Sequence, residues 1–189
     1  MKLEVPVREL GPVAAEPLAE AVLGSTEAHW REETLRQERF EQHHDTESLI
    51  LCFCDGWPEL VMQKGSAWDR LYPFAAPVIA EILALGYPRG GKVVRLMAAK
   101  LKAGGRIALH ADTHPSFGIG HRIHVPLKTN TQVEFIVDGE QVCMTPLHAY
   151  EIDNRRKHSV SNGGDDDRIH LVFDYVPPRF LDDGKSVPQ

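Results

Sequence analysis

The stretch GRIALHAD, residues 105–112, opens the part of the chain that decides its fold. Around it, short apolar segments alternate with turn sequences such as Asp138-Gly139 and Gly163-Gly164. Segments of this kind, bounded by Gly and Asp, indicate β-strands joined by turns. Many short strands at this spacing predict a sandwich or a small barrel. The expected strands lie near residues 93–102, 106–112, 121–128, 132–137, 141–145, 148–153, 157–161 and 168–176.

The first half of the chain shows helical spacing around a single strand. An apolar stripe through residues 66–86 indicates a helix, which Pro73 and Pro77 are expected to divide into a short and a longer piece. We therefore expect a mainly β protein whose helices lie in its N-terminal part. The other predicted elements are a helix over 13–23 that ends at Gly24, a helix from Ser25 or Thr26 to about Gln37, and a buried strand over 48–54.

Size and composition are those of an ordinary globular protein. The 189 residues are 42% hydrophobic and 25% charged, which is enough apolar material for a substantial core. We expect a single domain over residues 1–189. Its expected parts are a helical region with one strand (1–90), a β core (91–176) and a tail (177–189).

Charge and hydropathy argue against several classes of partner. The net charge of −6 disfavours a general electrostatic grip on nucleic acid or anionic lipid. No apolar run approaches the roughly 18 residues needed to span a bilayer, and the N-terminal sequence MKLEVP lacks the apolar core of a signal peptide. The sequence therefore predicts a cytoplasmic protein, and it gives no indication of the oligomeric state.

Three residues of the β half have the types and order of a metal site. His110 and Asp112 are two residues apart, so one strand would place both side chains on the same side. His158 follows in a later β-like stretch. Two imidazoles and one carboxylate can hold one face of a non-haem iron(II) and leave its other positions open. Arg168 then starts a further strand, where its planar guanidinium could bind a carboxylate at two points.

Arg122 and His124 form a second alternating pair, on the strand expected over 121–128. Ile123, Val125 and Leu127 occupy the opposite face of that strand. Arg122 and His124 therefore point either into a polar barrel interior or to water, and the pattern alone does not decide between them. An interior position would require an anionic partner, because an unpaired buried charge is costly.

Several linked segments resemble the aspartyl/asparaginyl β-hydroxylase family, which belongs to the Fe(II)- and 2-oxoglutarate-dependent dioxygenases. The resemblance covers residues 93–176, and residues 45–57 are also similar to bacterial members. It implies a double-stranded β-helix core, also called jelly-roll or cupin-like, with the N-terminal helices packed on it. The segments that carry it are GRIALHAD (105–112), HRIHVPL (121–127), EIDNRRKHSVSN (151–162) and DRIHLVFD (167–174).

The resemblance also implies roles for the candidate metal ligands and for Arg168. His110, Asp112 and His158 would bind the iron, and Arg168 would bind the distal carboxylate of 2-oxoglutarate. The implied cofactors are Fe(II), O2 and 2-oxoglutarate as cosubstrate.

Arg122 and His124 would meet the other carboxylate of 2-oxoglutarate, at its metal-chelating end. This implication favours the interior position for Arg122. The serine that assists the distal carboxylate in some family members has no counterpart near Ala98 and Ala99. The residue that completes the distal end of the site is therefore not identified by the sequence.

The implied reaction is hydroxylation of an unactivated C–H bond of an amino acid, a peptide side chain or a related small metabolite, with release of succinate and CO2. The substrate, the hydroxylated carbon and the stereochemistry are not indicated. We expect substrate contacts from the helical first half and from the loop between Thr113 and Gly120. One alternative is a cupin-like zinc or manganese isomerase or hydrolase, and another is a non-catalytic β-helix domain that binds a ligand.

Overall fold

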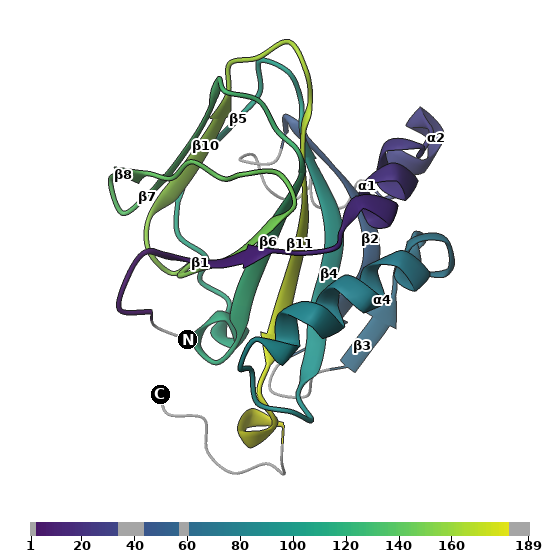
Figure 1. Cartoon of the computed structure of the whole chain (residues 1–189), viewed down its shortest axis with the longest axis vertical. Helices are drawn as coiled ribbons and strands as arrows, with labels where there is room; N and C mark the ends of the chain where they lie inside the picture. Colours follow the sequence, from purple (N-terminus) through teal and green to yellow (C-terminus); the bar gives the residue numbers. More distant parts are fainter. Residues whose placement is uncertain (1–2, 34–43, 57–60, 182–189) are drawn as a thin grey trace.

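Two antiparallel sheets face each other and form a jelly roll (Figure 1). The computed structural model describes residues 3–33, 44–56 and 61–181. The larger sheet runs in the order β1 (Val7–Pro12), β9 (His148–Ile152), β6 (His121–Lys128), β11 (Arg168–Val176), β4 (Lys92–Leu101), β2 (Thr46–Asp55) and β3 (Val61–Lys64). The smaller sheet runs in the order β5 (Arg106–His110), β10 (His158–Asn162), β7 (Val133–Val137) and β8 (Glu140–Gln141).

Strand β11 lies in the middle of the larger sheet and is buried along its whole length. Alternate residues of a strand point to opposite faces. Leu171 and Phe173 pack in the main hydrophobic core on the helix side. On the other face, Arg168, His170 and Asp174 point into the space between the two sheets, where their side-chain partners lie. The strand thus carries an apolar face for stability and a polar face for the interior.

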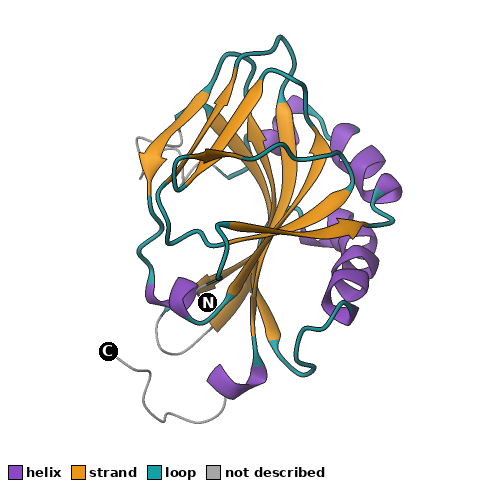
Figure 2. Ribbon diagram, turned by 60° about the vertical axis from the view of Figure 1, so that its left-hand side comes forward, coloured by secondary structure: helices purple, strands orange, loops and turns teal. Residues whose placement is uncertain are grey.

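The helices cover the outer face of the larger sheet and leave its inner face to the smaller sheet (Figure 2). The sequence explains this side, because α4 buries Leu71, Ala75, Val78, Ile79 and Ile82 as one apolar stripe. None of the helices in the described residues is long and apolar enough to cross a membrane. The helical elements are α1 (Glu16–Leu23), α2 (Glu27–Trp30), α4 (Trp68–Ala84) and the 3₁₀ turns η2 (Pro115–Gly118) and η3 (Pro178–Phe180).

Most predicted strands are confirmed, and the differences fall at sheet edges. Strand β8 is shorter than the expected 141–145, and β1 and β3 were not predicted. The residues of β3 are all exposed, and those of β1 are exposed or half-buried. Such edge strands bury little apolar surface, so they lack the alternation by which strands are predicted. The N-terminal half therefore contributes three strands to the larger sheet, where the sequence indicated one.

Two helix predictions were wrong in their boundaries. Pro73 and Pro77 lie inside the continuous helix α4 rather than dividing it. Each proline removes one backbone hydrogen bond, and the buried stripe of α4 against the sheet offsets that loss. Helix α2 is capped by Thr26 as expected, but it ends after Trp30 instead of continuing to Gln37. Residues 34–37 lie outside the described residues.

A buried polar cluster joins β9, β6 and β1 on the helix side of the larger sheet. Glu151 is 1% exposed. Its carboxylate is 2.5 Å from Nδ1 of His121 and accepts hydrogen bonds from Tyr87 at 2.9 Å and from Arg8 at 2.5 Å. Burial opposes ionisation of Glu151, but these partners outweigh it and hold its pKa below the ordinary value of 4.5.

We expect Glu151→Gln to destabilise the fold by about 3–5 kcal/mol at neutral pH, because it removes the buried carboxylate that pairs with Arg8 and His121. The sign of the pH dependence follows from the lowered pKa of Glu151. Its stabilisation is complete above the unfolded-state pKa and is lost as the pH falls through the folded-state pKa. Urea unfolding of wild type, Glu151→Gln and the exposed control Glu140→Gln at about pH 7 and about pH 4 measures this. Equal losses of unfolding free energy on acidification in wild type and Glu151→Gln would contradict the predicted pH dependence.

Candidate active site

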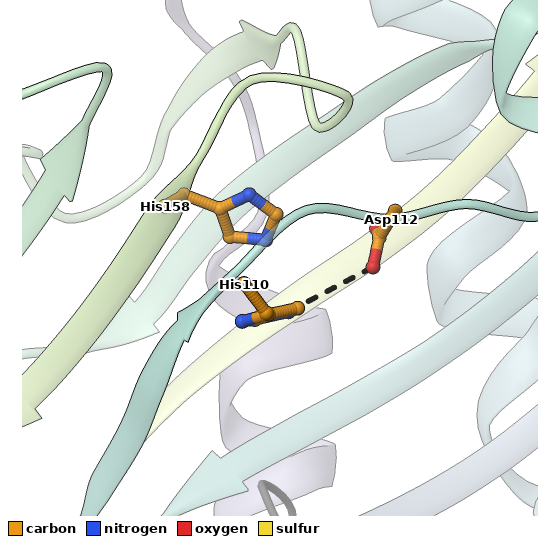
Figure 3. A group of neighbouring side chains, drawn as sticks. All are labelled: His110, Asp112 and His158. Carbon is orange, nitrogen blue, oxygen red and sulfur yellow. Dashed lines mark ion pairs between the residues drawn. The ribbon is translucent and has the colours of Figure 1, made fainter.

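The three predicted metal ligands come together where the smaller sheet ends (Figure 3). Strands β5 and β10 pair so that His110 and His158 stand directly opposite each other. Their ring centroids are 4.3 Å apart. Together with Asp112, each offers a ligand atom, and these atoms all lie within 4.8 Å of one another. Residues distant in sequence thus form a compact two-histidine, one-carboxylate group.

Asp112 reaches this group in a different way from the one expected. Strand β5 ends at His110, so Asp112 belongs to the segment after the strand rather than to the strand itself. Its backbone N–H donates to the carbonyl oxygen of Asn154 at 3.0 Å, which holds the segment beside the turn before β10. The pairing partner is therefore the β9–β10 turn, a contact that alternation along one strand cannot reveal.

The carboxylate of Asp112 has one oxygen committed to the protein and one directed at the histidines. Oδ2 accepts hydrogen bonds from Arg122 Nη1 at 2.5 Å and from Asn154 Nδ2 at 2.7 Å. Oδ1 lies 3.7 Å from Nε2 of His110. Burial would raise the pKa of Asp112, but Arg122 and Asn154 outweigh it and keep that pKa below its ordinary value. Asp112 is therefore an anion with Oδ1 available for one-point metal binding.

Both imidazoles are held in the tautomer that suits a metal ligand. Nδ1 of His110 is 2.8 Å from the carbonyl oxygen of Ala108, and Nδ1 of His158 is 2.9 Å from that of Arg156. A carbonyl only accepts, so each Nδ1 carries a hydrogen and each Nε2 offers its lone pair. Burial lowers the pKa of His158 and favours its neutral form.

Behind the ligands, three neighbouring strands place a row of charges on the inner face of the larger sheet. Asp174 of β11 is the register partner of Arg95 on β4 and of Arg122 on β6. Its carboxylate is 2.7 and 2.8 Å from Nε and Nη2 of Arg122 and 3.2 Å from Nη1 of Arg95. Arg122 thus lies in the interior, as the family resemblance implies, with its charge already paired to carboxylates.

The loop between β5 and β6 is attached to this row of charges. Arg95 donates to the hydroxyl oxygen of Ser116 at 2.8 Å. The ring of Phe117 lies 4.7 Å from the guanidinium carbon of Arg95 and 4.6 Å from that of Arg122. The expected substrate loop is therefore anchored to the same arginine that holds Asp112.

Arg95, Asp174 and Asn154 were not identified as site residues from the sequence. The signal for Arg95 and Asp174 is a charge inside an otherwise apolar strand, which requires a buried partner. Both are buried, at 5% and 3% exposure. Their partnership depends on the strand order β6–β11–β4, which the sequence does not show.

Arg168 lies buried at the other end of β11. It is 4% exposed, and in the described part of the chain it forms no ion pair with a carboxylate. Its guanidinium carbon lies 5.6 Å from the ring centre of Phe135, and Nη2 is 2.9 Å from Nδ1 of His170. Burial lowers the pKa of Arg168 to about 9, so it remains a cation at neutral pH. An anionic ligand would supply the missing charge.

His124 lies beside Phe135 and His170, the two residues that contact Arg168. Its ring stacks on Phe135 at 6.1 Å and meets His170 edge-on at 5.8 Å. Three buried nitrogen atoms have no hydrogen-bond partner among the described residues: His124 Nδ1, Arg168 Nε and His170 Nε2. A cavity of about 360 Å³ reaches Arg168, His170 and Phe135 from the side of residues 129–133 and 141–146.

Solved structures similar to this chain share its fold. An oxidoreductase of the 2OG-Fe(II) oxygenase family from Burkholderia pseudomallei matches with TM-score 0.63 and 15% identity, over 92% of this chain and 85% of that one. The nickel complex of a non-haem monooxygenase, ThoJ, matches with TM-score 0.58 and 16% identity, over 92% and 74%. A prolyl-4-hydroxylase from Pseudomonas putida matches with TM-score 0.52 and 13% identity, over 92% and 94%.

Sequence comparison gives the family. A comparison with curated proteins finds no match. The sequence profile of the aspartyl/asparaginyl β-hydroxylase family matches residues 18–178. This range includes every candidate site residue. With this match over most of its length and a jelly-roll fold, the chain belongs to the aspartyl/asparaginyl β-hydroxylase family.

Proposed function

We propose that the protein is an Fe(II)- and 2-oxoglutarate-dependent dioxygenase. It hydroxylates an unactivated C–H bond of an amino acid, a peptide side chain or a related small metabolite, and releases succinate and CO2. One observation supports this most: a two-histidine, one-carboxylate group shares the interior with Arg168, a buried arginine that has no counter-ion in the described part of the chain. The two-histidine, one-carboxylate group suits iron(II), and the buried arginine suits a dicarboxylate.

The residues fit the cofactors by their donor chemistry. His110, Asp112 and His158 would hold the iron through two Nε2 atoms and one carboxylate oxygen. Arg168 would bind the distal carboxylate of 2-oxoglutarate. His124, whose Nδ1 has no partner among the described residues, would face its chelating end. When bound, Fe(II) with 2-oxoglutarate and O2 supplies the oxidising power for C–H hydroxylation.

The protein's own part in the reaction is to position the metal ligand, the cosubstrate and the substrate, and to exclude water. Arg122 holds Asp112 by its Oδ2 and is held in turn by Asp174. The proposed contact of Arg122 with the chelating carboxylate would use the remaining donor capacity of its guanidinium. Phe117 lies against Arg122, so the loop that carries it is our proposed substrate-contacting segment, which would shield the reacting carbon from water.

The substrate we propose is a small molecule or peptide encountered in the cytoplasm. The zinc or manganese isomerase or hydrolase alternative would leave Arg168 without a function, since that chemistry needs no buried cation for a dicarboxylate. A non-catalytic ligand-binding domain would not require Asp112 to keep one oxygen directed at the histidines. Metal analysis combined with an assay for succinate release separates these three functions.

Replacing a proposed ligand should abolish iron binding. We expect His158→Ala and Asp112→Ala each to lose stoichiometric Fe(II), because two remaining ligands cannot hold the ion on one face. Anaerobic Fe(II) titration followed by metal analysis measures the loss. Asp166→Asn, which changes an exposed carboxylate, is the control. Stoichiometric iron in both ligand variants would remove the basis of the proposed function.

Asn154 should tune the metal site without being a ligand. Its side chain supplies one of the two hydrogen bonds to Oδ2 of Asp112. We expect Asn154→Ala to weaken metal affinity by about 10- to 100-fold, measured by Co(II) titration against a competing chelator. Gln132→Ala, which removes an exposed amide, should leave affinity unchanged. An unaltered Co(II) affinity in Asn154→Ala would show that Arg122 alone orients the carboxylate.

Arg168→Ala should leave metal binding intact and weaken the binding of 2-oxoglutarate. We expect 2-oxoglutarate affinity to fall by at least about 30-fold, equivalent to about 2 kcal/mol, because a buried charge-assisted contact is lost. Calorimetry with the Ni(II)-loaded protein measures this without turnover. Arg168→Lys keeps the charge but not the planar fork, so it should recover only part of the loss. Wild-type affinity in Arg168→Ala would refute the role of Arg168.

A further inference from the structure

The imidazole of His170 has a defined tautomer, because its neighbour can only donate. Nη2 of Arg168 lies 2.9 Å from Nδ1 of His170. A guanidinium has five N–H donors and no acceptor, so Nδ1 must accept this hydrogen bond. In the neutral ring the proton then sits on Nε2. His170 is therefore a hydrogen-bond donor through Nε2 and an acceptor through Nδ1.

That Nε2–H group is buried and has no partner in the described residues. His170 is 1% exposed, and its Nε2 atom is without a hydrogen bond. A buried donor left without an acceptor is destabilising, so a histidine that only fills space is unfavourable at this position. Nε of Arg168, the residue that donates to Nδ1 of His170, is likewise buried and without a hydrogen-bond partner among the described residues. Two side chains in contact, each with a buried donor that lacks an acceptor in the described part of the chain, indicate one anionic ligand.

The surroundings of His170 leave room for such a ligand. Its register partner on β4 is Ala99, which has only a methyl side chain. His170 and Arg168 both line the cavity of about 360 Å³. Burial, followed by the nearby Arg168 charge, lowers the pKa of His170 well below its ordinary value. The ring is therefore neutral at physiological pH, in agreement with the tautomer that the geometry requires.

We propose that His170 is the second donor of the distal carboxylate site. Its Nδ1 accepts from Arg168 and fixes the guanidinium, while its Nε2–H donates to the same carboxylate that Arg168 binds. This inference rests on the proposed function, since it concerns 2-oxoglutarate as the ligand. It identifies the residue that completes the distal end of the site.

The test compares two 2-oxoacids of equal chain length on the Ni(II)-loaded protein. 2-Oxoglutarate carries the distal carboxylate, and 2-oxopentanoate has a methyl group in its place. We expect His170→Phe to weaken 2-oxoglutarate by about 10- to 100-fold, the range for a hydrogen bond to a charged group, and to leave 2-oxopentanoate little changed. Calorimetry gives both affinities, and thermal unfolding shows whether the variant is folded.

Two further variants separate the two nitrogen atoms of His170. In His170→Asn the amide can reach the position of Nδ1, and in His170→Gln it can reach that of Nε2. We expect Gln to retain more 2-oxoglutarate affinity than Asn, because it can still donate to the carboxylate. His148→Phe, which changes a part-exposed histidine on β9, is the matched control and should bind both 2-oxoacids like wild type.

The wild-type protein gives an independent reading if His170→Phe does not fold. Ring-nitrogen NMR should show His170 protonated on Nε2, and this signal should shift on addition of 2-oxoglutarate but not of 2-oxopentanoate. Equal weakening of both 2-oxoacids, unchanged 2-oxoglutarate binding in His170→Phe, or a proton on Nδ1 would each overturn the inference alone. A wild-type protein that binds iron but no 2-oxoglutarate would overturn the proposed function as well.

Discussion

The interior of this jelly roll depends on one carboxylate shared by two guanidinium groups. Asp174 is buried between Arg95 and Arg122, its register partners on the two neighbouring strands. An unpaired charge at this depth would cost several kcal/mol, so the three side chains fix one another. Arg122 also binds Oδ2 of Asp112. Through Arg122, therefore, Asp174 on the central strand of the larger sheet helps to set the position of a proposed iron ligand that follows the smaller sheet.

The two ends of β11 treat charge in opposite ways. At the Asp174 end, carboxylates of the protein neutralise the arginines. At the Arg168 end, the cation has an aromatic ring and a neutral imidazole beside it but no carboxylate among the described residues. Paired buried charges hold their side chains in place, whereas a buried cation without a counter-ion favours the binding of an anionic ligand. One strand therefore combines a permanent support for the metal group with a site whose charge a ligand completes.

The sequence predicted the parts that local pattern controls. Strands β4, β6 and β11 were found from alternation and turn residues, and His110, Asp112 and His158 from ligand type and order. The register of the strands could not be predicted from the sequence, because it depends on pairing between segments far apart in the chain. For that reason the pattern left Arg122 undecided between interior and water until the family resemblance favoured the interior. It gave no role to Arg95, Asn154 or Asp174. The edge strands β1 and β3 were missed since they bury little apolar surface.

The loop between β5 and β6 connects these local and non-local features. It includes the proposed ligand Asp112 and leads into β6, where Arg122 binds the carboxylate of Asp112. In between, Phe117 lies against the guanidinium groups of both Arg95 and Arg122. A substrate that displaces Phe117 would alter the packing of Arg122, and through it the carboxylate that faces the histidines. Substrate binding at this loop and the position of the proposed metal ligand would thus be coupled through Arg122, which two carboxylates hold in place.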